Sequence, residues 1–91
     1  MYNNQERPEK SFVLSRQTAK TGEFVVSDEV VISGTHQDGG KSIGVSFHKD
    51  EVVTIVHEDE AGVVISAPRF MLNVLLKWED LEESNLSLRE Q

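Results

Sequence analysis

The sequence predicts an α+β domain: a curved antiparallel sheet of four to five strands followed by one C-terminal amphipathic helix, with two copies paired as a dimer. Strict alternation of apolar and polar residues over 41–48 indicates a half-buried strand, and an Asp-Gly pair just before it is typical of a β-hairpin turn. The β-branched run 63–65 indicates a buried strand, and Ser66 and Pro68 after it suit the first turn of a helix.

The strands are expected to form one antiparallel meander. They are predicted at residues 23–33, 41–48, 52–57 and 63–65. Residues 12–14 form a further short apolar run, which is either a first strand or a docking segment. Polar residues 27–29 interrupt the first long strand and suggest a bend or a bulge. Phe47 shares one face of the alternating strand with Ile43 and Val45, so it either fills the core or, if a bulge shifts the strand, offers a ring on which a base stacks.

The expected helix carries an apolar stripe that is wide enough to cover the sheet and to contact a second copy of the chain. The stripe, and hence the expected dimer interface, consists of Met71, Val74, Leu75, Trp78 and Leu81. A chain of 91 residues buries only a modest core, and the absence of cysteine excludes disulfides that could reinforce it. Dimerisation is therefore the expected way to enlarge the core.

The chain is expected to form one domain over residues 11–84, between a polar lead at 1–10 and an acidic tail at 85–91. No apolar run approaches the roughly 20 residues of a membrane-spanning helix, and the first residues lack the apolar segment of a signal peptide. These observations predict a cytoplasmic or nucleoid-associated protein without a membrane partner. The lack of a basic nuclear-localisation run favours a bacterial or viral source.

Acidic residues outnumber basic ones, which gives a formal net charge of −7. The charge is uneven, because residues 1–20 carry a balance of +2 and residues 78–91 a balance of −4. An acidic net charge gives no support to a nucleic-acid surface, although it does not exclude one elsewhere on the domain. The acidic tail could instead recruit a protein partner.

The sequence contains no constellation of residues for catalysis, so it predicts no enzyme and no cofactor. His36, His48 and His57 lack helical spacing, and a zinc site built from them would need a fourth ligand. The acidic residues 58–60 are interpreted as a solvated turn rather than a cation site. Residues 39–42 lack the glycine spacing and the helix of a phosphate-binding loop. No catalytic residue and no metal ligand is therefore expected.

The order of the expected elements resembles that of the positive cofactor four family, transcriptional coactivators that bind single-stranded DNA. The similar segments are residues 24–27 at the strand opening, 31–33 and 39–41 around the hairpin, 43–47 in the alternating strand, and 62–66 at the step into the helix. Together they extend over roughly residues 23–80. The resemblance implies a homodimer whose helices pack together and whose curved strands form a channel for single strands.

The resemblance also implies a set of contacts to DNA and a role in transcription, replication or recombination. By position, it assigns contacts to Lys41 at the hairpin and to Phe47, His48 and Lys49 on the strand that follows. The N-terminal cations could strengthen this weakly basic surface. They are Lys10, Arg16 and Lys20. The first hypothesis is therefore a sequence-independent single-stranded DNA-binding protein of the coactivator type.

Two alternatives remain open at this point. Short segments such as residues 14–16 and 56–60 are similar to landmarks of the carbon storage regulator family of RNA-binding dimers. That family has an arginine after the histidine, where this chain has Glu58, so this resemblance ranks lower. The other alternative is an acidic protein-interaction module, an inhibitor or an adaptor, with no nucleic-acid partner.

Overall fold

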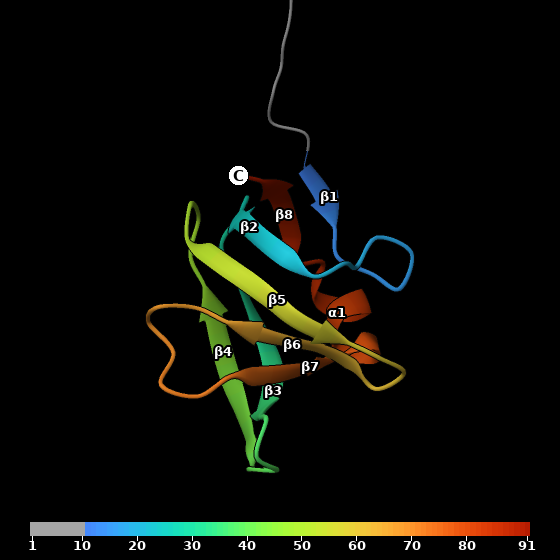
Figure 1. Ribbon diagram of the computed structural model, residues 1–91, viewed down its shortest axis with the longest axis vertical. Helices are drawn as coiled ribbons and strands as arrows, with labels where there is room; N and C mark the ends of the chain where they lie inside the picture. The colour runs from blue at the N-terminus through green and yellow to red at the C-terminus, as the bar shows by residue number, and fades with distance from the viewer. Residues whose placement is uncertain (1–10) are drawn as a thin grey trace, which may run out of the picture.

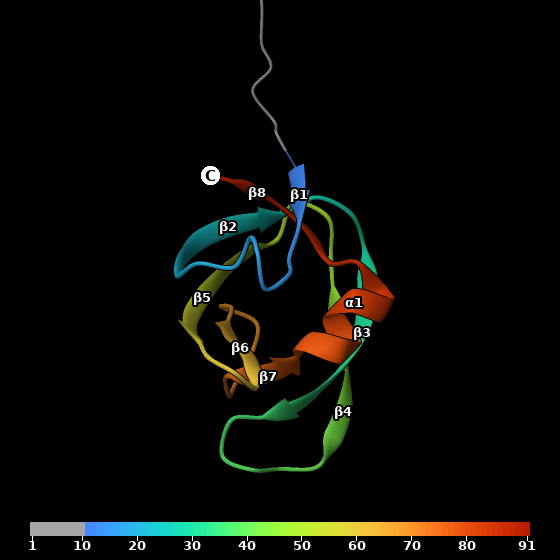
Figure 2. The same cartoon turned by 90° about the vertical axis from the view of Figure 1, so that its right-hand side faces the viewer.

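One antiparallel sheet of eight strands curls into a half-barrel in the computed structural model, which describes residues 11–91 (Figures 1 and 2). The strands are β1 (Ser11–Val13), β2 (Gly22–Val26), β3 (Val30–His36), β4 (Ser42–Phe47), β5 (Val52–Glu58), β6 (Gly62–Ser66), β7 (Val74–Lys77) and β8 (Ser87–Glu90). A single short helix, α1 (Trp78–Ser84), joins β7 to β8. The order across the sheet is β1-β8-β2-β5-β6-β7-β3-β4, so β1 and β4 form its two edges.

The expected class, four to five strands followed by an amphipathic C-terminal helix, is wrong. Residues 74–77 extend the sheet as β7, which pairs with β6 on one side and with β3 on the other. Val74 and Leu76 are buried, whereas Leu75 and Lys77 are more exposed, which is the period of two that a strand requires. The same apolar residues also fit a helical stripe. Pairing with two neighbouring strands outweighs the helical preference of leucine, because tertiary contacts routinely override intrinsic propensity.

The five residues expected on one helical face for dimerisation do not share a face. Val74, Trp78 and Leu81 belong to the core, because their side chains are at most 6% exposed. Leu75 is half-buried on β7, and Met71 lies in the loop before it with 99% of its surface exposed. The helical stripe that was expected to carry the dimer interface is therefore not formed within residues 11–91.

Residues 85–91, expected as an acidic tail, belong to the sheet. The β8 strand within them lies between β1 and β2 and pairs with both. Asn85 adopts the left-handed conformation that ends α1, and its main-chain N–H donates to the carbonyl oxygen of Leu81 at 2.9 Å. This turn directs Leu86 and Leu88 into the core, where both are fully buried. The folded domain therefore extends beyond the expected boundary at residue 84.

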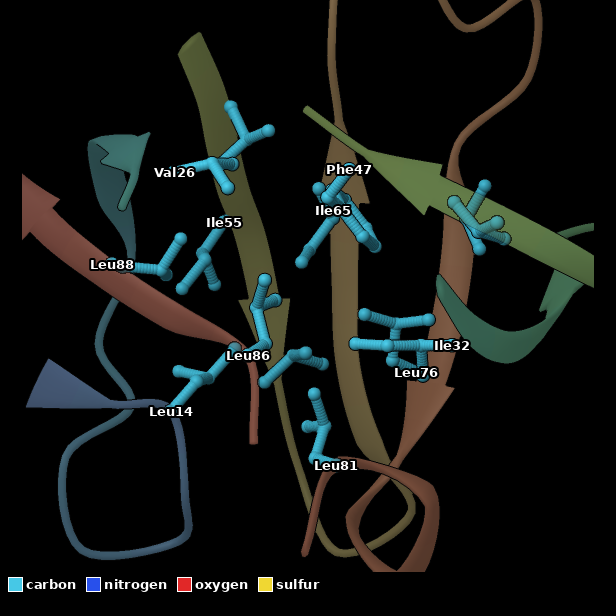
Figure 3. Close-up of a cluster of buried hydrophobic side chains, with 14 of the residues drawn as sticks. Leu14, Val26, Ile32, Phe47, Ile55, Ile65, Leu76, Leu81, Leu86 and Leu88 are labelled. Atoms are coloured by element: carbon cyan, nitrogen blue, oxygen red, sulfur yellow. The ribbon is translucent and has the colours of Figure 1, made fainter. Parts of the chain in front are cut away.

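The core lies on the concave side of the sheet and receives side chains from the strands, from α1 and from the segment after β1 (Figure 3). Phe47 is fully buried there, which is the first of the two alternatives that its position in the sequence left open. Trp78 anchors the start of α1, because its indole N–H donates to the carbonyl oxygen of Asp59 at 2.9 Å. No helix within residues 11–91 is long and apolar enough to cross a membrane.

Candidate functional site

The residues expected to contact DNA do not converge in the structure. Lys41 precedes β4 and Lys49 follows it, so the two lysines lie at opposite ends of this strand. His48 is exposed beside Lys49. The ring of Phe47 is buried and offers no face for stacking.

The N-terminal cations are engaged elsewhere. The guanidinium carbon of Arg16 lies 5.6 Å from the centre of the Trp78 ring, and Lys20 Nζ lies 3.0 Å from a carboxylate oxygen of Glu90. Lys10 lies outside the described residues. The expected cations are therefore spread over several parts of the domain rather than along one channel.

A hollow of about 560 Å³ lies beside the edge strand β4. We call it the β4 groove. Its lining consists of His36, Ile43, Gly44, Val45, Ser46, Arg69, Phe70, Met71, Leu72 and Val74. Strands β3, β4 and β7 and the loop between β6 and β7 contribute these residues, so the groove has β4 as one wall and the loop 67–73 as the other. Most of the lining is apolar, as is usual for binding sites.

Arg69 fastens the loop to β4. Its Nε and Nη2 atoms donate to the two carboxylate oxygens of Glu51 at 2.8 and 3.0 Å, and Nη2 also donates to the main-chain carbonyl oxygen of Ser46. The guanidinium stacks on the ring of Phe70, with its carbon 5.2 Å from the ring centre. Phe70 in turn packs edge-on against Phe47, with ring centres 5.9 Å apart. This wall of the groove is therefore tied directly to the core.

A second set of contacts holds the other end of the loop. The main-chain N–H of Gln37 donates to the carbonyl oxygen of Asn73 at 2.9 Å, and the Asn73 side chain donates to the Gln37 side chain at 3.2 Å. Between the two fixed ends, Met71 is 99% exposed and Leu72 48% exposed. Large apolar side chains held open beside a hollow are typical of an interaction surface.

The outer edge of β4 presents unpaired main-chain groups. Within residues 11–91, β4 pairs with β3 alone. The Ser46 carbonyl, which Arg69 binds, points away from β3. Because main-chain groups alternate between the two sides of a strand, those of Ser42 and Gly44 point to the same outer edge. Such an edge is a template for a further strand.

The imidazole of His36, which lines the groove, has a buried nitrogen atom that lacks a partner. Its Nδ1 atom is buried and has no hydrogen bond to any described residue. No other side-chain nitrogen or oxygen of residues 11–91 is left buried in this way. A buried polar atom without a partner costs about 1–3 kcal/mol of stability.

No carboxylate lines the β4 groove. Glu51 approaches it only through Arg69, and the exposed acids of α1, including Glu82 and Glu83, are not among its lining residues. Asp59 has a structural role in the turn between β5 and β6: the main-chain N–H of Ala61 hydrogen-bonds to its carboxylate and lowers the pKa of Asp59. Within residues 11–91, no group of three or more acidic or histidine side chains could hold a metal ion.

The clamp between Arg69 and Glu51 makes a testable contribution to stability. Hydrogen bonding from Arg69 lowers the pKa of Glu51 below its ordinary value of 4.5. A lowered pKa means that the clamp stabilises the fold fully above about pH 4.5 and that this stabilisation is lost as the pH falls through the lowered value. We expect Glu51→Gln to reduce the free energy of unfolding by about 1 kcal/mol at about pH 7, and by less as the pH falls below 4.5.

Urea titrations at a series of pH values measure this difference. The matched control is Glu90→Gln, because Glu90 pairs with Lys20 at 3.0 Å but both side chains are more than 60% exposed. We expect this control to lose less than about 0.5 kcal/mol at every pH. A loss for Glu51→Gln that is the same at pH 4 as at neutral pH would contradict the role of the charged clamp.

Sequence reasoning missed the β4 groove because it assigned residues 71–76 to a helix. The loop has one local signal in the sequence. Pro68 and Asn73, which both form helix interiors poorly, lie on either side of the exposed pair Met71 and Leu72.

No protein-family model, no curated protein and no solved structure matches this chain. The function is therefore inferred from the groove itself and from the charges around it.

Proposed function

We propose that this chain is a protein-interaction module that binds an extended segment of another protein along the free edge of β4. The observation that carries the proposal is the β4 groove, in which unpaired main-chain groups adjoin an apolar hollow of about 560 Å³. A strand added to an exposed edge gains main-chain hydrogen bonds, while its alternate side chains enter pockets that provide specificity. The groove offers both kinds of contact.

The two walls of the groove favour a single extended segment as the occupant. The loop 67–73 stands opposite β4 and is fixed at both ends, by Arg69 to Glu51 and by Asn73 to Gln37. An added strand would lie between these walls along Ser42 and Gly44, because Arg69 already occupies the Ser46 carbonyl. We therefore take a single extended segment, rather than a second sheet, as the occupant.

The charge of the groove favours an apolar partner over a nucleic acid. Arg69 in the lining is paired with Glu51 at 2.8 Å, so its guanidinium is not free for a phosphate. Arg89, which lies outside the groove on β8, is likewise paired with Asp50 at 2.8 Å. Single-strand binders need cations along the backbone and exposed rings for stacking. Phe47 and Trp78 are buried, which removes two of the rings that could serve. Binding of single-stranded DNA is therefore kept as the alternative result that the experiments below can detect.

Selection from a library of random peptides tests the proposal, with the affinity of the selected peptide measured by fluorescence anisotropy. We expect Leu72→Ser to weaken binding about tenfold or more, because burial of a leucine contributes roughly 1.5–3 kcal/mol. The matched control is Val31→Ser, because Val31 is 62% exposed on the outer face of the same hairpin. We expect this control to bind as the unmodified protein does.

Main-chain pairing has its own test. Peptides that are N-methylated at the residues facing β4 should lose binding, whereas methylation of the alternating residues should leave it intact, because only the former donate to the edge. In the free protein we expect rapid hydrogen exchange at the Gly44 amide, which becomes protected when the peptide binds.

Three other outcomes count against the proposal. The first is a library that yields no peptide sensitive to Leu72→Ser. The second is tight binding of a single-stranded oligonucleotide that falls steeply between about 50 and 200 mM salt and weakens with Lys41→Ala and Lys49→Ala. The third is a dimer, seen by light scattering, that Leu72→Ser dissociates, because a second copy would then occupy the groove.

A further inference from the structure

We infer that the segment bound in the β4 groove inserts a tyrosine side chain whose hydroxyl pairs with Nδ1 of His36. This inference rests on the proposed function, because it names the residue by which the groove recognises its partner. It depends on three observations, which are the place of the His36 ring, the missing partner of its nitrogen, and the apolar surface that surrounds it.

His36 is the last residue of β3, and it lies opposite Val74 of β7. The residue lines the groove together with Ile43 and Val74. A Cβ atom placed on Gly40 would lie 3.5 Å from Cδ2 of His36, so this edge of the ring faces the turn between β3 and β4. Nδ1 is on the opposite edge of the ring and faces away from that turn.

The missing partner of Nδ1 stands out because two other polar side chains around the groove, those of Arg69 and Asn73, are paired. Arg69 is bound to Glu51, and Asn73 is bound to Gln37. Buried polar groups in native proteins nearly always have a partner, and an exception needs an explanation. A bound segment that supplies the partner is such an explanation, because it would complete the polar contacts of an otherwise apolar site.

A hydroxyl is the group that fits this nitrogen in either tautomer. Nδ1 accepts a hydrogen bond when the proton is on Nε2 and donates one when it carries the proton itself. A hydroxyl donates and accepts, whereas the indole N–H of tryptophan only donates. Nδ1 is covered in this structure, so we expect the ring to turn about its Cβ–Cγ bond when it meets the hydroxyl.

The remaining lining selects an aromatic carrier for that hydroxyl. Ile43, Val45, Phe70 and Leu72 offer apolar surface, and a hollow of about 560 Å³ is larger than a serine or threonine side chain can fill. Phe70 can receive a second ring in the edge-to-face arrangement that aromatic side chains prefer. Tyrosine combines a large apolar ring with a terminal hydroxyl, and a site of this kind therefore suits it.

A double-mutant cycle tests the pairing. The probe is a fluorescein-labelled peptide of sequence TVTYTVT, in which tyrosine and both valines share one face of an extended chain, and the matched probe is TVTFTVT. We expect the unmodified protein to bind the tyrosine peptide about tenfold more tightly than the phenylalanine peptide. We expect His36→Phe to bind the two peptides equally, because it removes the partner of the hydroxyl while keeping a ring in place.

Nuclear magnetic resonance supplies a second readout that needs no substitution. The ¹⁵N resonance of His36 Nδ1 should shift when the tyrosine peptide binds and should shift far less with the phenylalanine peptide, because ring nitrogens report directly on hydrogen bonding. This measurement decides the question if His36→Phe does not fold.

The outcomes separate the inference from the function on which it rests. Equal affinity of the unmodified protein for both peptides, or a preference for tyrosine that His36→Phe retains, overturns the inference and leaves the proposed function standing. The inference is also overturned, and the proposed function again stands, if neither probe binds while library peptides without tyrosine bind and lose affinity with Leu72→Ser. A library that yields no binding peptide overturns the proposed function, and the inference with it.

Discussion

Gly62→Ala is expected to prevent folding. Gly62 begins β6 with a φ of +156° and lies opposite Lys77 of β7. A Cβ atom at this position would overlap the carbonyl oxygen of Leu76, and it would lie 2.9 Å from Cα of Lys77. These are main-chain atoms inside a ladder of paired strands, so they cannot move aside as a flexible side chain could. We expect a loss of more than about 4 kcal/mol, which is close to the whole stability of many small domains.

Circular dichroism and urea titration measure this effect. The matched control is Gly44→Ala, because a Cβ atom on Gly44 would meet only Cγ1 of Val31, at 3.9 Å. We expect the control to unfold within about 0.5 kcal/mol of the unmodified protein. A Gly62→Ala variant that unfolds at the same urea concentration as the unmodified protein would show that β6 and β7 do not approach as closely as described here.

Removal of residues 86–91 is also expected to abolish the fold. This deletion takes away β8 and two leucines that are fully buried, Leu86 and Leu88. Loss of a buried leucine side chain alone typically costs about 2–5 kcal/mol, and the deletion also leaves β1 and one side of β2 without a paired strand. The truncated chain should therefore lack a cooperative unfolding transition.

The control for this deletion is removal of Gln91 alone, because Gln91 is exposed and follows the end of β8. We expect it to keep the melting temperature of the full chain within a few degrees. A cooperative transition retained after removal of 86–91 would restore the view of this segment as a dispensable tail.

The strands of the central meander were accessible from the sequence because they show local signals. Alternation over residues 41–48 matches β4, and the apolar run at 63–65 falls inside β6. The segment 23–33 was expected as one bent strand, but it forms β2 and β3, which have different neighbours in the sheet. No local pattern reveals that separation, because the chain must leave one part of the sheet and enter another.

The C-terminal third was misjudged because its apolar residues satisfy two periods at once. Val74, Leu76 and Trp78 repeat every second residue, yet Val74, Trp78 and Leu81 also repeat at helical spacing. The true helix begins only at Trp78 and ends at Ser84. The choice between the two periods is made by partners that are distant in sequence, such as Thr35 of β3 opposite Leu75.

The site was less predictable than the fold for a related reason. The wall of the β4 groove depends on the pairing of Arg69 with Glu51, which are 18 residues apart in the sequence. Some of the cations expected to bind DNA pair with acidic residues that are still further away in the sequence, as Lys20 does with Glu90. A basic residue in a sequence indicates a charge, but only the fold shows whether that charge is available to a ligand. Likewise, the missing hydrogen bond of His36 has no signature in the sequence.

The pairing of β1 with β8 has a practical consequence for attachment. Because Ser11 lies opposite Arg89, the chain enters and leaves the sheet side by side, at the edge opposite β4 (Figure 1). A domain whose first and last described strands lie side by side is suited to insertion into another protein. The module can therefore be placed in a surface loop of a host, or fused at either end to a fluorescent reporter or a surface anchor, with the β3–β4 hairpin still facing outward.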